Sequence, residues 1–374
     1  MNQPSCNAGK TYYVVFSMTN DKGILIKNIY YMLAYAFQVL KQSNYDQVTS
    51  EEFGNIQHLF AAILAKGIAQ QLKQGLHREY ISECDNLSGM RGKLDIYRTI
   101  DNKLQRKQRL FCEYDELSAN NVFNQILKTT AVILLRQSTV SDECRTGLKK
   151  VILFFDGVDM IEPACIKWNM LRYQRNNQSY KMLLNICYFV LDGLLLSTEK
   201  GEFKMATFLD EQHMSRLYEK FVLEYYRYHH PKLRPAASQV VWDLNDGVID
   251  FLPIMQTDIT LRNEEKILII DTKYYAHTMQ VQYNTRKLHS DNLYQIFTYV
   301  KNQDFGSTGN VAGMLLYAKT EETITPDCDF MISGNKIMVK TLDLNIDFNN
   351  IAAKLDKIAE SYFGVGIKED DHGV

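Results

Sequence analysis

Hydrophobic residues recur at helical spacing through much of the first half of the chain. The stretch Asn28–Lys41 carries aromatic residues on more than one face, which predicts a helix enclosed on several sides. A second helix is expected over Glu51–Gln74, with Gly75 suited to its C-terminal end. The same spacing predicts further helices at Asn120–Leu135, Glu143–Phe155, Ser179–Ser197 and Asp210–His230.

Strand-like patterns separate and follow these helices. In the first half, Tyr80–Ile100 and Phe111–Leu117 are expected to be extended. The run Ile267–Ile270 is almost continuously apolar, which is typical of a central strand covered on both faces. After Pro231, the pattern predicts strands at Gln239–Trp242, Val248–Leu261, Ile267–Tyr274 and Ala312–Tyr317, with a helix at Asp291–Asn302 before the last strand.

The length of 374 residues is sufficient for two domains, each with its own core. We expect a poorly ordered leader at 1–22, a mixed α/β N-terminal domain at 23–170 and a second domain at 171–374. In the second domain the predicted order is helix, strand, strand, strand, helix, strand, so its fold class is α/β with an αβββαβ core.

The charge balance bears on how the chain would meet a nucleic acid. With 42 Lys and Arg against 44 Asp and Glu, the formal net charge is −2. A protein that binds DNA unaided usually has a surplus of basic residues, because neutralising phosphates supplies much of the affinity. Either the basic residues cluster locally, as at 103–109, or a partner delivers the DNA. Taken alone, such a cluster is more often a solvated surface.

The cysteine pattern indicates a reducing compartment. The seven cysteines are odd in number and form no C-x-x-C motif, which argues for free thiols and a cytoplasmic protein. We see no secretory signal. The longest apolar runs, Ile24–Leu40 and Met182–Leu196, are interrupted by polar residues, so we expect buried helices and no membrane span.

Two acids and one lysine define the candidate catalytic site. Asp271 and Lys273 are two positions apart on a predicted strand, so their side chains share a face. Asp258 lies on the preceding strand, joined by the short connector Arg262–Lys266, so the two carboxylates can meet. A Mg²⁺ ion held by both acids beside a phosphate would satisfy all three charges. This is the layout of a PD-(D/E)xK nuclease site, although an isolated D-x-K triplet is usually a surface feature.

Three more residues are weaker candidates. Gln295 and Tyr299 lie at i and i+4 on the next predicted helix, where they could reach the site and position the backbone or Lys273. As an isolated pair they would be read as helix-surface residues. Glu219 lies well away from the apolar stripe of its helix. An exposed glutamate is the simpler interpretation of Glu219, and a water-mediated metal contact is the alternative.

Several motifs, in order from about Ile26, resemble those of the McrC family, the nuclease subunits of the McrBC methylcytosine-dependent restriction systems. The segments that carry the resemblance are 28–36, 89–94, 124–128, 257–260, 270–275 and 292–295. The resemblance implies a restriction-endonuclease-like second domain in which Asp258, Asp271 and Lys273 occupy catalytic positions. The backbone carbonyl of Thr272 would be a further metal ligand, whereas Glu219 falls at a position where the family is variable.

The resemblance also implies a partner, a McrB-like AAA+ GTPase oligomer that recognises modified cytosine in double-stranded DNA. The N-terminal domain would dock on this GTPase and stimulate it. Two alternatives stay open. The chain could be a non-catalytic adaptor that only activates an AAA+ motor, although an intact triad argues against that. It could also be a free-standing repair nuclease of the same fold, for which a more basic chain would be expected.

Overall fold

The computed structural model describes most of the chain, in ranges separated by gaps. The described residues are 20–21, 24–36, 53, 55–174, 177, 179–197, 203–205, 211–244, 246–247, 249–274, 280–282, 285–319 and 325–364. The predicted leader at 1–22 lies outside this set apart from 20–21, and so does the predicted first helix beyond residue 36. No helix in the described ranges combines the length and apolar composition needed to cross a membrane.

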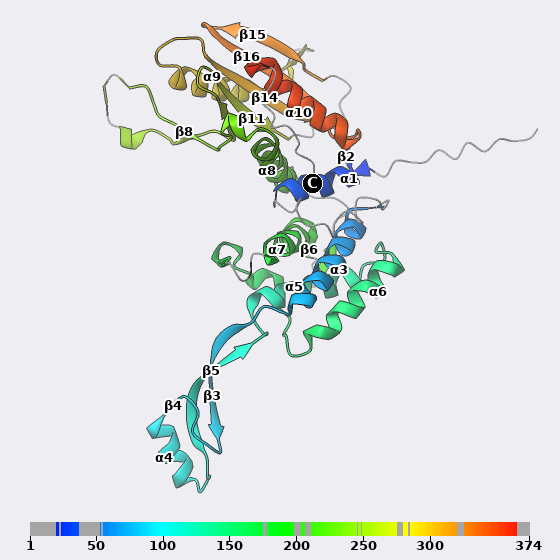
Figure 1. Cartoon of the computed structure of the whole chain (residues 1–374), viewed down its shortest axis with the longest axis vertical. Helices are drawn as coiled ribbons and strands as arrows, with labels where there is room; N and C mark the ends of the chain where they lie inside the picture. The colour runs from blue at the N-terminus through cyan, green and yellow to red at the C-terminus, as the bar shows by residue number, and fades with distance from the viewer. Residues whose placement is uncertain are drawn as a thin grey trace, which may run out of the picture.

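The described elements form two lobes and a projecting arm, in a mixed α/β protein (Figure 1). The sheet lobe holds a five-stranded sheet and its helices, and the arm extends from the helical lobe to the far end of the molecule. The helical lobe contains α3 (Ile56–Gln74), α5 (Val122–Leu135), α6 (Asp142–Ile152) and α7 (Tyr180–Tyr188). The sheet lobe contains α1 (Ile26–Ala36), α8 (Glu211–His229), α9 (Ser290–Gln303) and α10 (Phe348–Phe363).

The five-stranded sheet has the strand order β10-β11-β14-β16-β15. Its strands are β10 (Ile259–Arg262), β11 (Ile267–Lys273), β14 (Val311–Lys319), β15 (Cys328–Ile332) and β16 (Asn335–Asp343). The three central strands β11, β14 and β16 are parallel, and the two edge strands β10 and β15 pair antiparallel with their neighbours. The carboxyl ends of the central strands therefore meet at one edge of the sheet.

Helices cover both faces of the central strands, as the apolar run in β11 predicts. On one face, Ile269 packs in a cluster with Ile296 and Val300 of α9. On the other face, Leu268 belongs to a cluster that includes Phe221 of α8 and Leu355 of α10. Alternate residues of one strand thus enter different cores, which requires nearly every position of β11 to be apolar.

Gly313 of β14 sets the distance between α9 and the sheet. A Cβ atom at this position would lie 2.7 Å from Cγ1 of Ile296 and 2.8 Å from Cγ2 of Val300, both on α9. These separations are shorter than van der Waals contact, so only a residue without a side chain allows the helix to pack this closely.

Helix packing crosses the division at residue 170. Although α1 comes early in the chain, its Tyr35 hydroxyl lies 2.8 Å from Nε2 of His229 on α8. The side chain of Asn28 donates to the backbone oxygens of Leu344 (2.8 Å) and Ile346 (2.7 Å), just before α10. Conversely, α7 packs against α3 and α5 of the helical lobe. A cut at residue 170 would separate both α1 and α7 from the lobes that they help to build.

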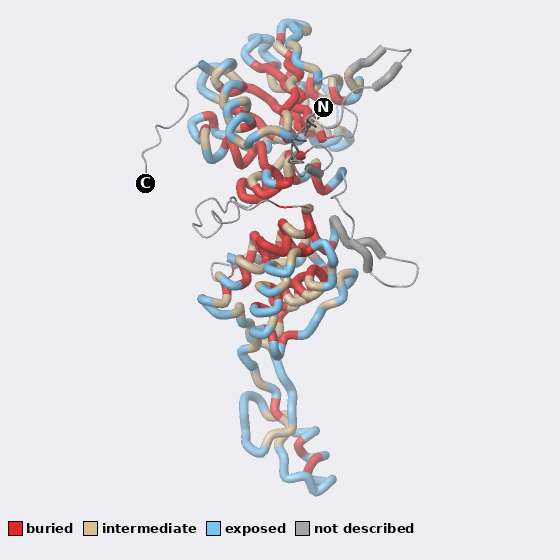
Figure 2. The backbone as a smooth tube through the Cα atoms, turned by 90° about the vertical axis from the view of Figure 1, so that its right-hand side faces the viewer, coloured by how far each residue is buried: buried red, intermediate tan, exposed pale blue. Residues whose placement is uncertain are grey.

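The arm is a long β-ribbon with a helix at its tip. Its elements are β3 (Glu79–Leu87), β4 (Lys93–Leu94), α4 (Ile96–Leu104) and β5 (Leu110–Ser118), of which β3, β4 and α4 each pack mainly on β5. Figure 2 shows that most of the arm is exposed. The predicted strand Tyr80–Ile100 is wrong at its end, because a helix begins after Asp95. The carboxylate of Asp95 accepts the backbone N–H of Arg98 at 3.1 Å and so caps that helix.

Most other predicted elements agree with the structure to within a few residues. Two differ. The predicted helix Ser179–Ser197 ends its regular part at Tyr188, and the predicted strand Val248–Leu261 contains a 3₁₀ turn. Short strands also pair as β1 (Asn20–Asp21) with β2 (Ile24–Leu25), β6 (Leu195–Ser197) with β7 (Phe203–Met205), β8 (Gln239–Val240) with β9 (Met255–Gln256), and β12 (Gln280–Gln282) with β13 (Thr285–Lys287). Single turns occupy Leu153–Phe155, Pro163–Cys165, Trp168–Met170, Phe189–Leu194 (π-helical), Pro231–Leu233 and Ile249–Phe251.

The substitution Gly313→Ala tests the close packing of α9. We expect it to lower the free energy of unfolding by about 1–3 kcal/mol, because Ile296 and Val300 must move to accept the methyl group. Chemical denaturation would measure the change. Gly306→Ala is a matched control, since its Cβ would meet a single atom at an ordinary 3.5 Å. Equal stability of the two variants would contradict the packing argument.

Candidate active site

The candidate active site lies at the carboxyl edge of the sheet, where β11 ends. Strand pairing places Ile259 of β10 opposite Ile270 of β11, so Asp258 and Asp271 lie next to each other across the two strands. Oδ2 of Asp258 accepts the backbone N–H of Thr272 at 2.7 Å and its hydroxyl at 2.8 Å. These two hydrogen bonds orient the Asp258 carboxylate against the end of β11.

The carboxylate of Asp271 is the most unusual group of the site. The residue is 1% exposed, and Nζ of Lys273 lies 2.7 Å from its Oδ2. Among the described residues, Oδ1 of Asp271 has no hydrogen-bond partner. Burial, followed by the negative charge of Asp258, raises the pKa of Asp271 to about 7, although Lys273 acts in the opposite direction. A buried carboxylate with an unused oxygen and a raised pKa is a group that a cation would stabilise.

Glu219 of α8 adds a third acid near this pair. It is half-buried, and its pKa is raised first by burial and then by the charge of Asp258. The positive charges of Lys273 and Arg216 partly offset this effect. The structure therefore brings Glu219 within electrostatic range of the site, whereas the helical stripe alone favoured an exposed glutamate.

Two residues of α9 continue the site from Lys273. The ammonium of Lys273 donates to Oε1 of Gln295 at 3.2 Å, and Nε2 of Gln295 donates to the hydroxyl of Tyr299 at 3.0 Å. The i, i+4 spacing allows this chain of contacts, because it places both side chains on one side of the helix. Lys273 is thus held between a carboxylate on its own strand and an amide on the helix above it.

Sequence reasoning assigned no role to a second polar pair beside Lys273. Nδ2 of Asn292 donates to the hydroxyl of Tyr317 at 3.1 Å, and both side chains are buried. Tyr317 lies directly beside Lys273 in the pairing of β14 with β11. The available signal was the position of Asn292, one helical turn before Gln295.

The donor set fits a hard divalent cation in part. Mg²⁺ is usually bound by one or two carboxylates and completes its shell with water, and Asp258 and Asp271 would supply those carboxylates. In the described parts of the chain, no three His, Cys, Asp or Glu side chains are already spaced to hold a metal ion. Asp258 is engaged by Thr272, and Asp271 by Lys273. Oδ1 of Asp271 makes no such contact among the described residues, so it is the oxygen available to a cation.

The fold and the site together define the class: an α/β protein with paired acids and a lysine at the carboxyl edge of its sheet. Such a polar site suits a charged substrate. The protein-family model described as McrBC 5-methylcytosine restriction system component matches residues 15–318 of the sequence. The chain belongs to that family.

Two known proteins are similar over most of the chain. The Type IV methyl-directed restriction enzyme EcoKMcrBC of Escherichia coli (strain K12) is 29% identical over 350 residues, which is 91% of this chain and 98% of that protein. A solved structure is described as a refined half-complex from the tetradecameric assembly of Thermococcus gammatolerans McrB AAA+ hexamers with bound McrC. One chain of that structure matches with a TM-score of 0.51 and 17% identity, over 89% of this chain and 76% of the matched chain.

The substitution Asp271→Asn tests the cost of burying this carboxylate. Because the folded pKa of about 7 lies above the ordinary value, the folded state holds the proton more tightly, and stability falls as pH rises between about 4 and 7. The cost is at most about 1.4 kcal/mol for each pH unit in that window. Without divalent cations, we therefore expect Asp271→Asn to raise the melting temperature, by more at pH 8 than at pH 5.

Asp304→Asn is the control of opposite sign. Burial would raise the pKa of Asp304, but hydrogen bonds from Thr308, Asn335 and Gly309 outweigh it and lower the pKa to about 2. Loss of that carboxylate should lower the melting temperature at pH 8. A lower melting temperature for Asp271→Asn under the same conditions would contradict the conclusion that burying the charged Asp271 carboxylate destabilises the fold.

Proposed function

We propose that the chain is the DNA endonuclease subunit of a modification-dependent restriction complex, active with Mg²⁺ when assembled with a McrB-like AAA+ GTPase. The observation that carries the nuclease assignment is the buried Asp271 carboxylate, with an unused oxygen, between Asp258 and Lys273. Family membership and the described assembly of the solved relative support the partner. The substrate would be double-stranded DNA, with the modified cytosine read by the partner.

Asp258 and Asp271 would hold the metal ion, with the backbone carbonyl of Thr272 as a further ligand and Glu219 reaching it through water. When bound, Mg²⁺ polarises the scissile phosphate and lowers the pKa of the attacking water. The hydrogen bonds from Thr272 fix the direction of the Asp258 carboxylate, so one ligand is already oriented before the substrate arrives.

Lys273 would stabilise the negative charge that develops on the phosphate oxygens, or orient the attacking water. Its side chain is 14% exposed, so its ammonium acts in a partly desolvated site where charge interactions are stronger than in bulk water. Gln295 accepts a hydrogen bond from this ammonium, and Tyr299 orients Gln295 in turn. These two residues are therefore assigned to positioning the lysine.

The exposed arm is the surface that we assign to docking on the GTPase. Tyr97 and Leu104 are 86% and 78% exposed, and they lie seven positions apart, on one side of α4. Large apolar side chains on an exposed helix are costly to leave in water, and they are typical of an interaction site. Docking of the arm would stimulate GTP hydrolysis by the partner.

The two alternatives make different predictions. A non-catalytic adaptor would stimulate the GTPase without any metal-dependent cleavage, and an intact Asp258–Asp271–Lys273 site would then have no purpose. A free-standing repair nuclease would cleave DNA without GTP or a partner. An assay of DNA nicking with and without the GTPase, GTP and Mg²⁺ separates the three possibilities.

The variants Asp258→Ala, Asp271→Ala and Lys273→Ala test the catalytic assignment. Each should reduce DNA cleavage by the assembled complex at least about 100-fold, because each removes a metal ligand or the charge that stabilises the transition state. Stimulation of the GTPase should survive, since the arm is unchanged. Asp329→Ala and Lys336→Ala, which break a half-exposed ion pair on the same sheet, serve as controls and should cleave normally. Full cleavage by Asp271→Ala, in a preparation free of other nucleases, would rule out the site.

The double substitution of Tyr97→Ala with Leu104→Ala tests the arm. Loss of two apolar anchors should weaken GTPase stimulation at least about tenfold at limiting concentrations of the chain. Both residues are exposed, so the stability of the isolated chain should change little. Met331→Ala, at a site 72% exposed on β15, is the matched control. Unchanged stimulation by the double variant would place the docking surface elsewhere.

A further inference from the structure

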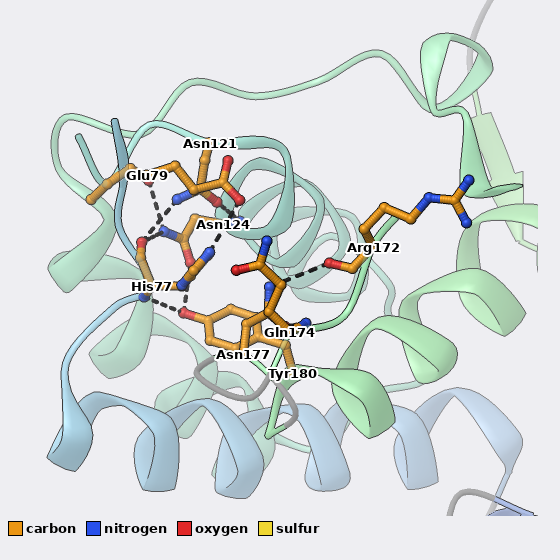
Figure 3. A network of polar contacts seen from close by, with 9 residues as sticks. His77, Glu79, Asn121, Asn124, Arg172, Gln174, Asn177 and Tyr180 are labelled. Carbon is orange, nitrogen blue, oxygen red and sulfur yellow. Dashed lines mark hydrogen bonds and ion pairs between the residues drawn. The ribbon is translucent and has the colours of Figure 1, made fainter. Parts of the chain in front are cut away.

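The arm joins the helical lobe through a buried polar network, which Figure 3 shows from close by. We call this network the root clamp, and it consists of His77, Asn121, Asn124 and Tyr180. His77 lies two positions before β3, while Asn121 and Asn124 belong to the start of α5 and Tyr180 is the first residue of α7. The clamp thus connects the arm to two helices of the lobe.

Asn124 ties together the two ends of the arm. Its Nδ2 donates to the backbone oxygen of His77 at 2.8 Å, before the ribbon, and to that of Ala119 at 2.7 Å, after it. Its Oδ1 accepts the hydroxyl of Tyr180 at 2.8 Å. That hydroxyl in turn accepts the backbone N–H of His77 at 2.7 Å. Two side chains therefore hold both backbone groups of His77 and the exit of β5.

Further contacts surround this centre. Nδ2 of Asn121 also donates to the backbone oxygen of His77, at 2.8 Å, and Nε2 of the His77 ring lies 3.1 Å from Oε1 of Glu79, the first residue of β3. The His77 ring packs edge-on against Phe123 and Tyr180, with ring centres 5.5 Å and 5.9 Å apart. These contacts surround His77 at the point where the chain leaves the lobe for β3.

The clamp is buried, which gives its hydrogen bonds more weight than surface contacts would have. Asn124 and Tyr180 are both 0% exposed, and Asn121 is 4% exposed. In a medium of low dielectric constant, a hydrogen bond is strong and an unpaired polar group is costly, so a satisfied network favours a single geometry. A clamp of this kind resists tilting of the arm more than an apolar contact would.

A small tilt of the arm at its root would displace the tip by a large distance. Each long strand of the arm has nine residues. Such strands extend roughly 30 Å at the usual rise per residue, so a tilt of about 10° at the root moves the tip by about 5 Å. A displacement of that size is larger than the distance of about 4 Å at which apolar side chains make contact.

We propose that Asn124 and Tyr180 are positioning residues that fix the direction of the arm, so that its tip meets the GTPase without a search over orientations. The proposal rests on the arm being the docking surface, as argued above. A pre-oriented arm loses less conformational freedom on binding, and this favours affinity over a hinged arm with the same tip. Loosening the clamp would weaken docking while the tip and the nuclease site stay chemically unchanged.

The variant Tyr180→Phe is the sharpest test, because it keeps the buried ring and removes only the shared hydroxyl. In the full chain, we expect the concentration for half-maximal stimulation of the GTPase to rise at least threefold, with the maximal rate nearly unchanged. Hydrogen exchange at the backbone amides near 77–81 and 117–119 should become faster. Asn124→Asp, which keeps the acceptor for Tyr180 and loses both donated bonds, should shift stimulation in the same direction.

Tyr226→Phe is the matched control. Tyr226 is also 0% exposed, and its hydroxyl donates to the backbone oxygen of Leu355 at 3.0 Å, in the sheet lobe. The Tyr226→Phe variant should lower thermal stability about as much as Tyr180→Phe. The concentration for half-maximal stimulation of the GTPase and the hydrogen exchange at the arm root should stay unchanged. A purely structural role of the clamp would instead make the two variants behave alike.

The outcomes separate this proposal from the docking assignment. If the tip variants at Tyr97 and Leu104 impair stimulation while Tyr180→Phe and Asn124→Asp do not, the clamp proposal is overturned and docking by the arm stands. If neither set changes stimulation, both are overturned. Stimulation lost in proportion to thermal stability, equally in Tyr180→Phe and Tyr226→Phe, would also overturn the positioning role.

Discussion

The burial of one carboxylate at the end of an apolar strand constrains the whole sheet lobe. β11 is covered by α9 on one face and by α8 and α10 on the other, so Asp271 is removed from water by the same packing that stabilises the sheet. A negative charge in that position must be compensated locally. Lys273 supplies that compensation from the same strand. Gln295 of α9, a helix that Gly313 allows to lie close to the strands, accepts a hydrogen bond from the lysine and so helps to hold it in place.

Sequence patterns predicted the elements whose signals are local. The apolar run Ile267–Ile270 identified β11, and the spacing of Asp258, Asp271 and Lys273 predicted that they would gather, which the strand register reproduces. Roles for these residues, for Gln295 and Tyr299, and for Mg²⁺ stay predictions. Glu219 could not be placed from its helix alone, because a helical stripe shows which face is apolar but not which polar residue lies near other charged groups.

Long-range packing accounts for what the patterns could not reveal. The positions of α1 and α7 depend on contacts with residues distant in sequence, such as Tyr35 with His229 and Tyr180 with Asn124, which periodicity does not encode. The helix α4 was not predicted because its local signal is one capping residue, Asp95, and because the residues that it buries, Thr99 and Asn102, are polar. The root clamp likewise consists of scattered asparagines whose shared purpose appears only in three dimensions.

The exposed arm has a consequence for the life of the free chain. Tyr80, Tyr97 and Leu104 are each at least 75% exposed on an arm that nothing in the described lobes covers. Exposed apolar surface of this kind favours association, so a subunit made in excess of its partner would self-associate as its concentration rises. Balanced synthesis of the two proteins would then matter for solubility as well as for activity. Expression of the subunit without its partner would give a lower yield of soluble protein.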